Sequence, residues 1–214
     1  MSQSFDIAVV GATGTVGETV VQVLEERHFP VGNLHLLASI ESAGHSVPFR
    51  GKNVRVREVD AFDFSQVRLA FFAAGPAISR SYAEKAIAAG CSVIDLSGAF
   101  PSAQAPNVVP EINATLLNTC GVAPHLVASP SASATAVALA LAPLRALLDI
   151  QSVAVTACLA VSALGREGVS ELARQTTELL NVRPLETRFF DRQMAFNVLA
   201  QVGKPDESGH LSLE

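Results

Sequence analysis

The sequence predicts an α/β fold built on a doubly wound parallel sheet. Apolar runs of strand length alternate along most of the chain with longer segments of helical periodicity. A glycine-rich segment, Gly11-Ala12-Thr13-Gly14-Thr15-Val16-Gly17, joins the first apolar run to the first helical segment. Alternation of this kind is typical of parallel sheets whose crossover helices cover both faces.

The elements follow in order from this pattern. We expect strands at residues 6–10, 34–38, 69–73, 92–96 and 126–129, and helices at residues 14–27 and 79–89. Residues 47–49 and 54–59 flank a turn at 50–53 and predict a hairpin. The alanine- and leucine-rich residues 134–148 predict a buried helix.

The pattern changes after Ser152. Residues 153–161 predict another strand and residues 170–180 a helix, and the stretch to residue 193 mixes charges with Phe189 and Phe190. We therefore expect two domains, at residues 1–130 and 131–214, the second beginning near Ser131 and incomplete at its C-terminal end.

Composition indicates a soluble globular protein of one or two domains. The chain has 214 residues, of which 49% are hydrophobic and 16% charged, with a formal net charge of -5. This acidic balance argues against a nucleic-acid partner, and the arginines between Arg50 and Arg57 alternate like the solvated face of a strand. The longest apolar stretch, 132–144, is interrupted by polar residues and falls short of the ~20 residues that a membrane span needs.

Cysteine usage and the N-terminus predict a cytoplasmic protein. No basic leader precedes Asp6, so no secretion signal is expected. Cys91, Cys120 and Cys158 are odd in number and far apart, which fits neither a disulfide framework nor a zinc site. We expect no metal.

The glycine turn, defined here as residues 11–17, predicts a dinucleotide-binding site. Gly11 permits a tight turn, Gly14 lets the backbone approach a pyrophosphate, and Gly17 lets the helix pack closely on the strand. The helix N-terminus then directs its amides at the phosphates. The alternative is a structural turn that serves the strand–helix junction alone.

Side chains at the ends of the next strands bear on the cofactor. Glu41 lies 24 residues beyond Gly17, where an acid can hydrogen-bond a ribose 2′-hydroxyl but would repel an NADP 2′-phosphate. The alternative for Glu41 is a solvated loop residue. Ala74 and Gly75 offer a backbone with little side chain, and Asp95 either serves the cofactor region or caps a turn.

A set of short segments runs in order through nearly the whole chain: residues 11–17, 37–39 with 42–44, Asp95 with Ser97, Ala99 and Phe100, residues 109–113, Pro130 before a helix, and residues 195–198. Together these segments resemble one family, aspartate-semialdehyde dehydrogenase, and most of all its Usg-type non-catalytic relatives. The resemblance implies a Rossmann domain, a second α/β domain used for dimerisation, a homodimer, and NADPH-linked reduction of aspartyl phosphate through a cysteine thioester.

Residues from both the patterns and the resemblance make up the expected cofactor site, for NAD or NADP. They are Gly11, Thr13, Gly14, Thr15, Val16, Gly17, Ser39, Glu41, Ser42, Ala74, Gly75, Ser97 and Ser162.

The catalytic positions of the family are altered here. Where the family has Pro-Asn-Cys, this chain has Pro130-Ser131-Ala132, and alanine cannot form a thioester. Ser131 and Ser133 flank the position, but a serine needs an activating base, and Ser133 is more simply a helix N-cap. Cys91 and Cys158 are expected in or beside buried strands, and Cys120 in a loop at the opposite end of the sheet.

Four further positions also lack the polar or basic residue that the resemblance implies. Glu41 and His45 stand where the resemblance places an arginine and a lysine near the 2′-phosphate, so we expect NAD rather than NADP. Pro101 replaces the arginine that binds the substrate phosphate, and Leu159 replaces the glutamine beside the cysteine. We therefore expect no catalytic residue and no family reaction.

Other candidate groups do not restore a catalytic site. His28, His35, His125 and His210 are expected to be surface or packing residues. The family's general-base histidine and substrate-binding arginine lie beyond residue 214, and Ser212 is a plausible N-cap of a helix that the chain does not complete, which predicts truncation. A short-chain dehydrogenase is excluded because Ala86, not lysine, follows four residues after Tyr82.

Two classes of function remain open. One is a non-catalytic relative that binds a nucleotide or acts as a subunit or scaffold. The other is an oxidoreductase of altered aldehyde or acyl-phosphate specificity. The sequence also leaves open whether any dinucleotide binds.

Overall fold

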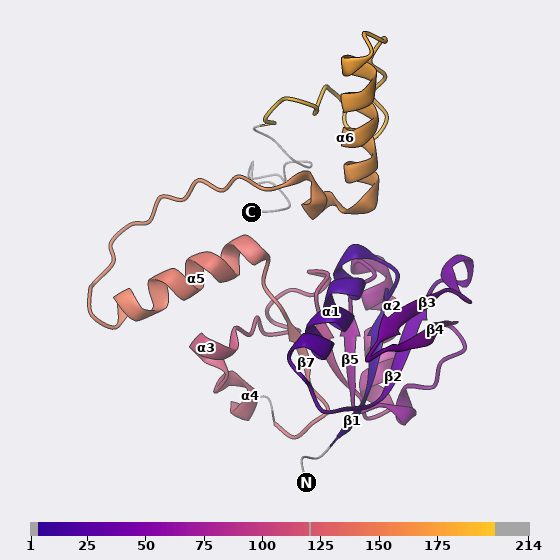
Figure 1. The fold of residues 1–214 in the computed structure, drawn as a ribbon. Coiled ribbons are helices and arrows are strands. Elements are labelled where there is room, and N and C mark those ends of the chain that lie inside the picture. Colours follow the sequence, from indigo (N-terminus) through magenta and orange to yellow (C-terminus); the bar gives the residue numbers. More distant parts are fainter. Residues whose placement is uncertain (1–3, 120, 200–214) are drawn as a thin grey trace. The chain divides into compact units, whose positions relative to one another are not determined.

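The computed structural model describes residues 4–119 and 121–199 (Figure 1). Contacts within the chain divide it into two compact units, the first ending at Val153 and the second beginning at Ala154. Each unit is described by itself. The domain boundary expected after residue 130 stays a prediction.

A seven-stranded sheet organises the first unit and confirms the predicted α/β class. Its order is β3-β4-β2-β1-β5-β6-β7. All neighbouring strands are parallel except β3 and β4, which form the predicted hairpin. The strands are β1 (Phe5–Val10), β2 (Val31–Ala38), β3 (Ser46–Phe49), β4 (Lys52–Glu58), β5 (Leu69–Phe72), β6 (Ser92–Asp95) and β7 (Leu126–Ala128).

Helices complete the two units. They are α1 (Thr15–Glu26), α2 (Pro76–Ala88), α3 (Pro110–Asn113), α4 (Leu116–Thr119), α5 (Ala132–Arg145) and α6 (Gly165–Leu180), with 3-10 turns η1 (Ile40–Ser42), η2 (Phe64–Gln66) and η3 (Val161–Leu164). In the described part of the chain, no helix has the length and apolarity that crossing a bilayer requires.

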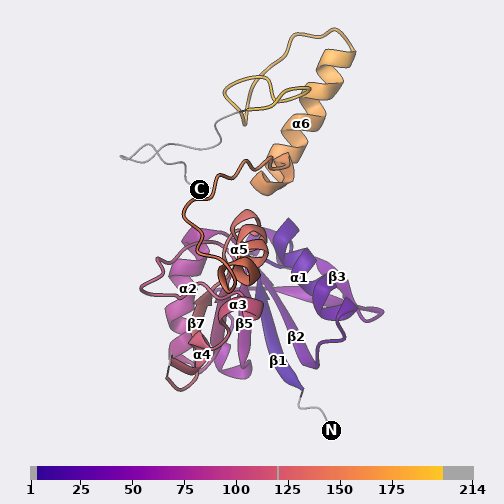
Figure 2. The same cartoon turned by 90° about the vertical axis from the view of Figure 1, so that its left-hand side faces the viewer.

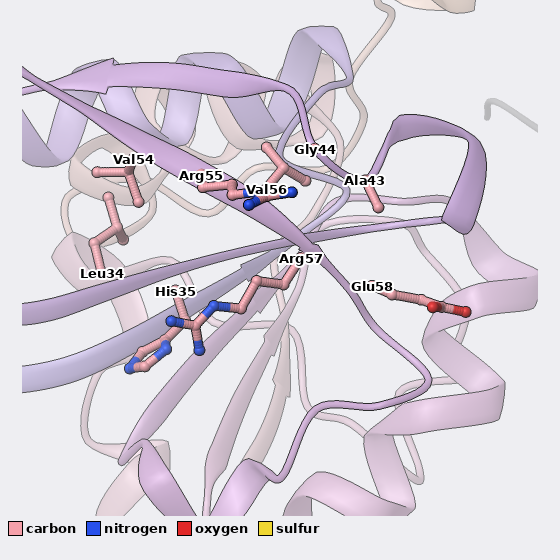
Figure 3. A pocket seen from close by; sticks show the side chains of 9 residues that line it. All are labelled: Leu34, His35, Ala43, Gly44, Val54, Arg55, Val56, Arg57 and Glu58. Atoms are coloured by element: carbon pink, nitrogen blue, oxygen red, sulfur yellow. The ribbon is translucent and has the colours of Figure 1, made fainter.

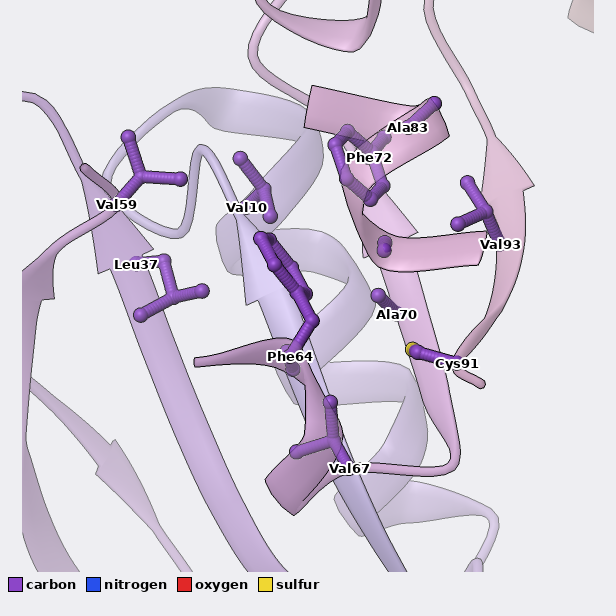
Figure 4. Packing of buried hydrophobic residues seen from close by; sticks show 12 residues of the cluster. Val10, Leu37, Val59, Phe64, Val67, Ala70, Phe72, Ala83, Cys91 and Val93 are labelled. Carbon is purple, nitrogen blue, oxygen red and sulfur yellow. The ribbon is translucent and has the colours of Figure 1, made fainter. Parts of the chain in front are cut away.

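The helices α1 and α2 cover opposite faces of the sheet (Figure 2). Alternation along β1 explains this arrangement, because successive side chains of a strand point to opposite faces. Ile7 and Val9 pack in one apolar cluster with Val21 and Leu24 of α1. The other cluster contains Ala8 and Val10 of β1 with Ala83 and Ala86 of α2; Figure 4 shows its side chains, among them Phe64 and Phe72.

The strand order reverses around β1, which places the site. The chain runs from β1 through α1 to β2 on one side, and later enters β5 on the other side of β1. Ligands of open α/β sheets bind beyond the carboxyl ends of the strands at such a switch point. The loops after β1 and β5 therefore border the candidate site.

Two expectations for the later part of the chain are wrong. Residues 151–160 form no strand, because a strand needs a neighbour for its backbone hydrogen bonds and the described residues supply none there. Cys158 is accordingly exposed and lies in no strand. The predicted buried helix forms as α5, but none of its residues is buried, since it packs mainly beside the short α3 (Figure 1).

The second unit is built on α6, which confirms the predicted helix at 170–180 and begins earlier, at Gly165. Its inner face carries polar side chains. Buried Gln175 accepts hydrogen bonds from the backbone amides of Met194 and Ala195, at 2.7 and 3.2 Å. Buried Glu171 is hydrogen-bonded by Arg174, by Gln175 and by the Arg188 amide. These bonds tie the segment after α6 back onto the helix.

The Glu171 contacts predict a pH-dependent loosening of that segment. Hydrogen bonds, first of all from Arg174, hold the pKa of Glu171 at about 2, against an ordinary 4.5. The stabilisation is therefore complete above pH 4.5 and is lost as the pH falls toward 2. We expect hydrogen exchange at the Arg188 amide, corrected for its intrinsic rate, to accelerate across this range.

The variant Glu171→Gln should exchange faster at neutral pH and lose most of this pH dependence. Glu167→Gln, in the first turn of the same helix and exposed, is the matched control. If the pH dependence of hydrogen exchange at the Arg188 amide were the same in Glu171→Gln as in the unmodified protein, Glu171 would not be the group that controls it.

Candidate functional site

The glycine turn folds tightly against two neighbouring loops. Gly11 has φ +84°, a left-handed conformation that favours glycine. Its amide donates to the Leu37 carbonyl of β2 at 2.8 Å. A Cβ at Gly11 would lie 2.7 Å from the Cα of Ala74, so the turn after β1 and the loop after β5 touch backbone to backbone.

Gly17 brings the first turn of α1 onto the end of β1. A Cβ there would lie 2.1 Å from the Gly11 carbonyl oxygen and 2.8 Å from the Cα of Ala12. Gly14 is the N-cap of α1 in an extended conformation, and its amide donates to the Gly11 carbonyl at 3.0 Å. The packing roles predicted for Gly11 and Gly17 therefore hold.

The loop after β5 contributes Ala74 and Gly75. Gly75 has φ +92° and is the N-cap of α2, with Pro76 in the first helical position. A Cβ at Gly75 would meet nothing within 4 Å. Glycine is favoured at residue 75 because of the positive φ, and not because a side chain would collide with its neighbours.

The loop after β2 holds the predicted ribose partner. Ser39 is the N-cap of η1, which contains Glu41 and Ser42. Glu41 is exposed, and its carboxylate has no hydrogen bond or salt bridge to any described residue. His45 follows in an exposed position just before β3.

A buried carboxylate organises the loop after β6. Asp95 is fully buried and accepts hydrogen bonds from the Ser97 hydroxyl at 2.6 Å, the Ser97 amide at 3.3 Å and the Ala99 amide at 3.0 Å. This confirms the turn-capping interpretation of Asp95. Sequence reasoning missed two residues that support this loop: Ser79, whose hydroxyl lies 2.9 Å from that of Ser97, and Arg80, which donates to the Ala99 carbonyl at 3.1 Å.

The junction between β7 and α5 holds Ala132, where the sequence resemblance places the family nucleophile. Ala132 is the first residue of α5 and is exposed. The N-cap is Ser131, whose hydroxyl accepts from the Ala134 amide at 3.3 Å. The prediction that Ser133 caps the helix is wrong, because the helix begins one residue before it. Pro101 is also exposed, in the turn that follows β6.

The structure brings most of the predicted site residues to one edge of the sheet. The glycine turn, Ser39, Ala74, Ser97 and Ala132 all follow the carboxyl ends of parallel strands. Leu159 and Ser162 belong to the second unit, where Leu159 precedes η3 and Ser162 lies within it, both exposed.

The remaining sequence candidates have ordinary structural roles or fall outside the described residues. Burial raises the pKa of the Cys91 thiol to about 12, so it is no nucleophile. His35 lies within β2 and is partly buried. Cys120, His210 and Ser212 are outside the described residues. In the described ranges no group of three or more His, Cys, Asp or Glu side chains is placed to hold a metal ion.

Comparison with known families agrees with this geometry. Residues 6–119 match the family model described as semialdehyde dehydrogenase, NAD binding domain, and residues 141–214 match semialdehyde dehydrogenase, dimerisation domain. The chain belongs to the semialdehyde dehydrogenase family. The predicted resemblance and the predicted Rossmann-type domain followed by a second domain are thereby confirmed.

Individual relatives include both branches of the expected resemblance. The chain is 62% identical to a USG-1 protein homolog of Azotobacter vinelandii and 42% identical to aspartate-semialdehyde dehydrogenase 2 of Vibrio cholerae, in both cases over 100% of this chain. These alignments cover 63% and 64% of the two relatives. The solved structure of a probable aspartate-semialdehyde dehydrogenase from Pseudomonas aeruginosa is 58% identical, with a TM-score of 0.95, over 99% of this chain and 63% of that one. The chain thus spans less than two thirds of the length of these relatives.

The Gly17 contact predicts a large loss of stability from a single methyl group. In Gly17→Ala the new Cβ meets backbone atoms, so α1 must move off β1, at a cost of about 3 kcal/mol. Gly51→Ala is the control, because open space surrounds Gly51 and only its φ of +73° is penalised, by about 1 kcal/mol.

Urea unfolding measures this difference through the fluorescence of Tyr82, the single tyrosine, which lies in α2 of the first unit. Equal losses in the two variants would contradict the close packing of Gly17.

Proposed function

We propose that the first unit binds a dinucleotide at the carboxyl edge of its sheet and prefers NAD to NADP. The observation that carries the proposal is the exposed carboxylate of Glu41 in the loop after β2, which has no hydrogen bond or salt bridge to a described residue. A free carboxylate there accepts hydrogen bonds from a ribose diol and repels a 2′-phosphate.

The shape of the glycine turn fits the phosphates of such a cofactor. The first amides of α1 lack carbonyl partners within the helix and point toward its N-terminal end. Gly14 has no side chain over this end, and a Cβ there would already lie 3.3 Å from the Gly11 carbonyl oxygen. Thr13, Thr15, Val16 and Gly17 would surround the pyrophosphate through their backbone.

The proposed cofactor site has further members on neighbouring loops. Ser39 and Ser42 flank Glu41, and Ala74 with Gly75 leaves room beside the glycine turn. Ser97 can act toward a ligand only as a hydrogen-bond acceptor, because its hydroxyl already donates its hydrogen to Asp95. Ser162 is proposed from the family resemblance alone.

We further propose that the chain does not carry out the family's thioester reaction. Ala132 presents a methyl group where the nucleophile would stand, and the neighbouring Ser131 hydroxyl is used as the cap of α5. Within the described residues, no histidine or carboxylate hydrogen-bonds Ser131 or Ser133 to activate it. Pro101 and Leu159 also lack the charge and the amide that the family uses to hold substrate.

We propose a homodimeric, non-catalytic protein in the cytoplasm, and the second domain supports the homodimer. A match to the family's dimerisation domain favours a homodimer, and its start at residue 141 is compatible with a domain boundary near residue 130. The second candidate function, an oxidoreductase with altered aldehyde or acyl-phosphate specificity, would show itself as turnover in the assay below.

Charge reversal at Glu41 tests cofactor preference. Glu41→Arg should tighten NADP binding by about 10-fold or more and weaken NAD binding, because a guanidinium pairs with a phosphate and no longer accepts from the ribose. Calorimetric titration with each cofactor measures both affinities. Glu84→Arg on the exposed side of α2 changes the net charge equally and should leave the preference for NAD. Absence of binding to either cofactor by the unmodified protein would refute the proposal.

Installing a thiol at residue 132 tests the catalytic assignment. In Ala132→Cys the new thiol should react with iodoacetamide, because the position is exposed, while turnover stays at background. The reason is that Pro101 and Leu159 still cannot hold substrate. Absorbance of the reduced cofactor at 340 nm, with aspartate semialdehyde, phosphate and NAD or NADP, follows the reaction. Robust turnover by Ala132→Cys would show that Pro101 and Leu159 do not prevent substrate binding and would contradict this explanation. Turnover by the unmodified protein would favour the second candidate function, an oxidoreductase of altered specificity.

A further inference from the structure

A concave region beside the hairpin carries nitrogen groups that the proposed cofactor site does not use. We call it the basic groove and define it by His35 of β2 with Arg55 and Arg57 of β4 (Figure 3). Ala43 and Gly44 also line the cavity, without large side chains, and so do Leu34 and Val54, but the side chains of Leu34 and Val54 pack against the apolar cluster under α1, on the other face of the sheet. The cavity has a volume of about 500 Å³.

The alternation of the two strands gathers these groups on one face. Val56 pairs with Leu36 in the parallel ladder, and both are buried in the cluster under α1. Their sequence neighbours His35, Arg55 and Arg57 therefore point to the other face. The helix on that face, α2, packs over β5, β6 and η2, so it leaves both arginines exposed.

Within the described residues, the guanidinium groups of the groove have no acidic partner. The side chains of Arg55 and Arg57 form no hydrogen bond or salt bridge with any described residue. Figure 3 shows the Arg57 guanidinium beside the His35 ring, and Glu58 pointing away from both. Asp6 of β1 is the acidic group that raises the pKa of His35. Its carboxylate already accepts hydrogen bonds from the backbone amide and the side-chain amide of Asn33.

This juxtaposition has an electrostatic consequence. Burial, and then the charge of Arg57, lower the pKa of His35 below 6.5, with Asp6 acting weakly in the opposite direction. An anion between His35 and Arg57 would reverse the second effect, because it favours the protonated imidazole.

We propose that the basic groove is a binding site for a phosphate group, separate from the dinucleotide site. Guanidinium groups match phosphate geometry through paired hydrogen bonds, and the imidazole adds a donor on the neighbouring strand. The phosphate can be the free ion or belong to a nucleotide, and the two sources are distinguished below.

The test titrates the full chain with inorganic phosphate and, separately, with adenosine 5′-monophosphate at constant ionic strength. We expect the ring resonances of His35 and the Nε resonance of Arg57 to shift with phosphate, and the pKa of His35 to rise. This measurement needs no variant. Unchanged His35 and Arg57 resonances with both ligands would overturn the proposal.

Variants then assign the affinity to the groove. Arg57→Gln and Arg55→Gln should each weaken phosphate binding by about 10-fold or more in calorimetry. Lys52→Gln is the control, since Lys52 is an exposed cation at the opposite end of β4. Adenosine monophosphate binding that is equally sensitive to Arg57→Gln identifies a nucleotide as a ligand, and a response to inorganic phosphate alone identifies the free ion. Equal weakening in Lys52→Gln and Arg57→Gln would mean a general charge effect and would overturn the site.

Discussion

The contact between Gly17 and the Gly11 carbonyl is the constraint on which the first unit depends. It fixes α1 against the end of β1 at a distance that no side chain permits. The Gly11 amide in turn donates a hydrogen bond to the carbonyl of Leu37 in β2, and Gly11 packs against the backbone of Ala74 after β5. One turn therefore sets the relative position of three strand ends, and the candidate site is the space that these ends enclose.

A second fixed point lies at the end of β6, where Asp95 is buried and no described cation forms a salt bridge with it. Its carboxylate is satisfied by donors from its own loop, namely the Ser97 amide and hydroxyl and the Ala99 amide. A buried carboxylate is tolerated only when its oxygens are well hydrogen-bonded, so this loop is held in one conformation. Because β7 pairs with β6 through Ala128 and Asp95, the same residue also fixes the approach to α5.

Much of this arrangement could be predicted from the sequence because local patterns decide it. The strands β1, β2, β5, β6 and β7 are short apolar runs between turns, and the hairpin is marked by alternation around residues 50–53. The failures come from partners that are distant in sequence. Residues 153–161 have strand composition, yet a strand forms only beside another strand. The cap of α5 depends on where β7 ends, so two serines two residues apart could not be distinguished by type alone. His35 and Arg57 meet across a ladder, which no local pattern reveals.

The structure also separates the residues that packing requires from those that it does not. Gly11 and Gly17 are needed for the strand–helix junction whether or not a nucleotide binds, so their presence alone says little about ligands. Ala132 is exposed and the N-cap of α5 is Ser131, so the helix does not depend on the side chain at residue 132 for its cap. The carboxylate of Glu41 likewise forms no hydrogen bond or salt bridge with any residue that the structure describes. A residue that packing does not require is constrained mainly by what the site binds. The charge of Glu41 is therefore more informative about a cofactor than the glycine turn, which the fold needs in any case.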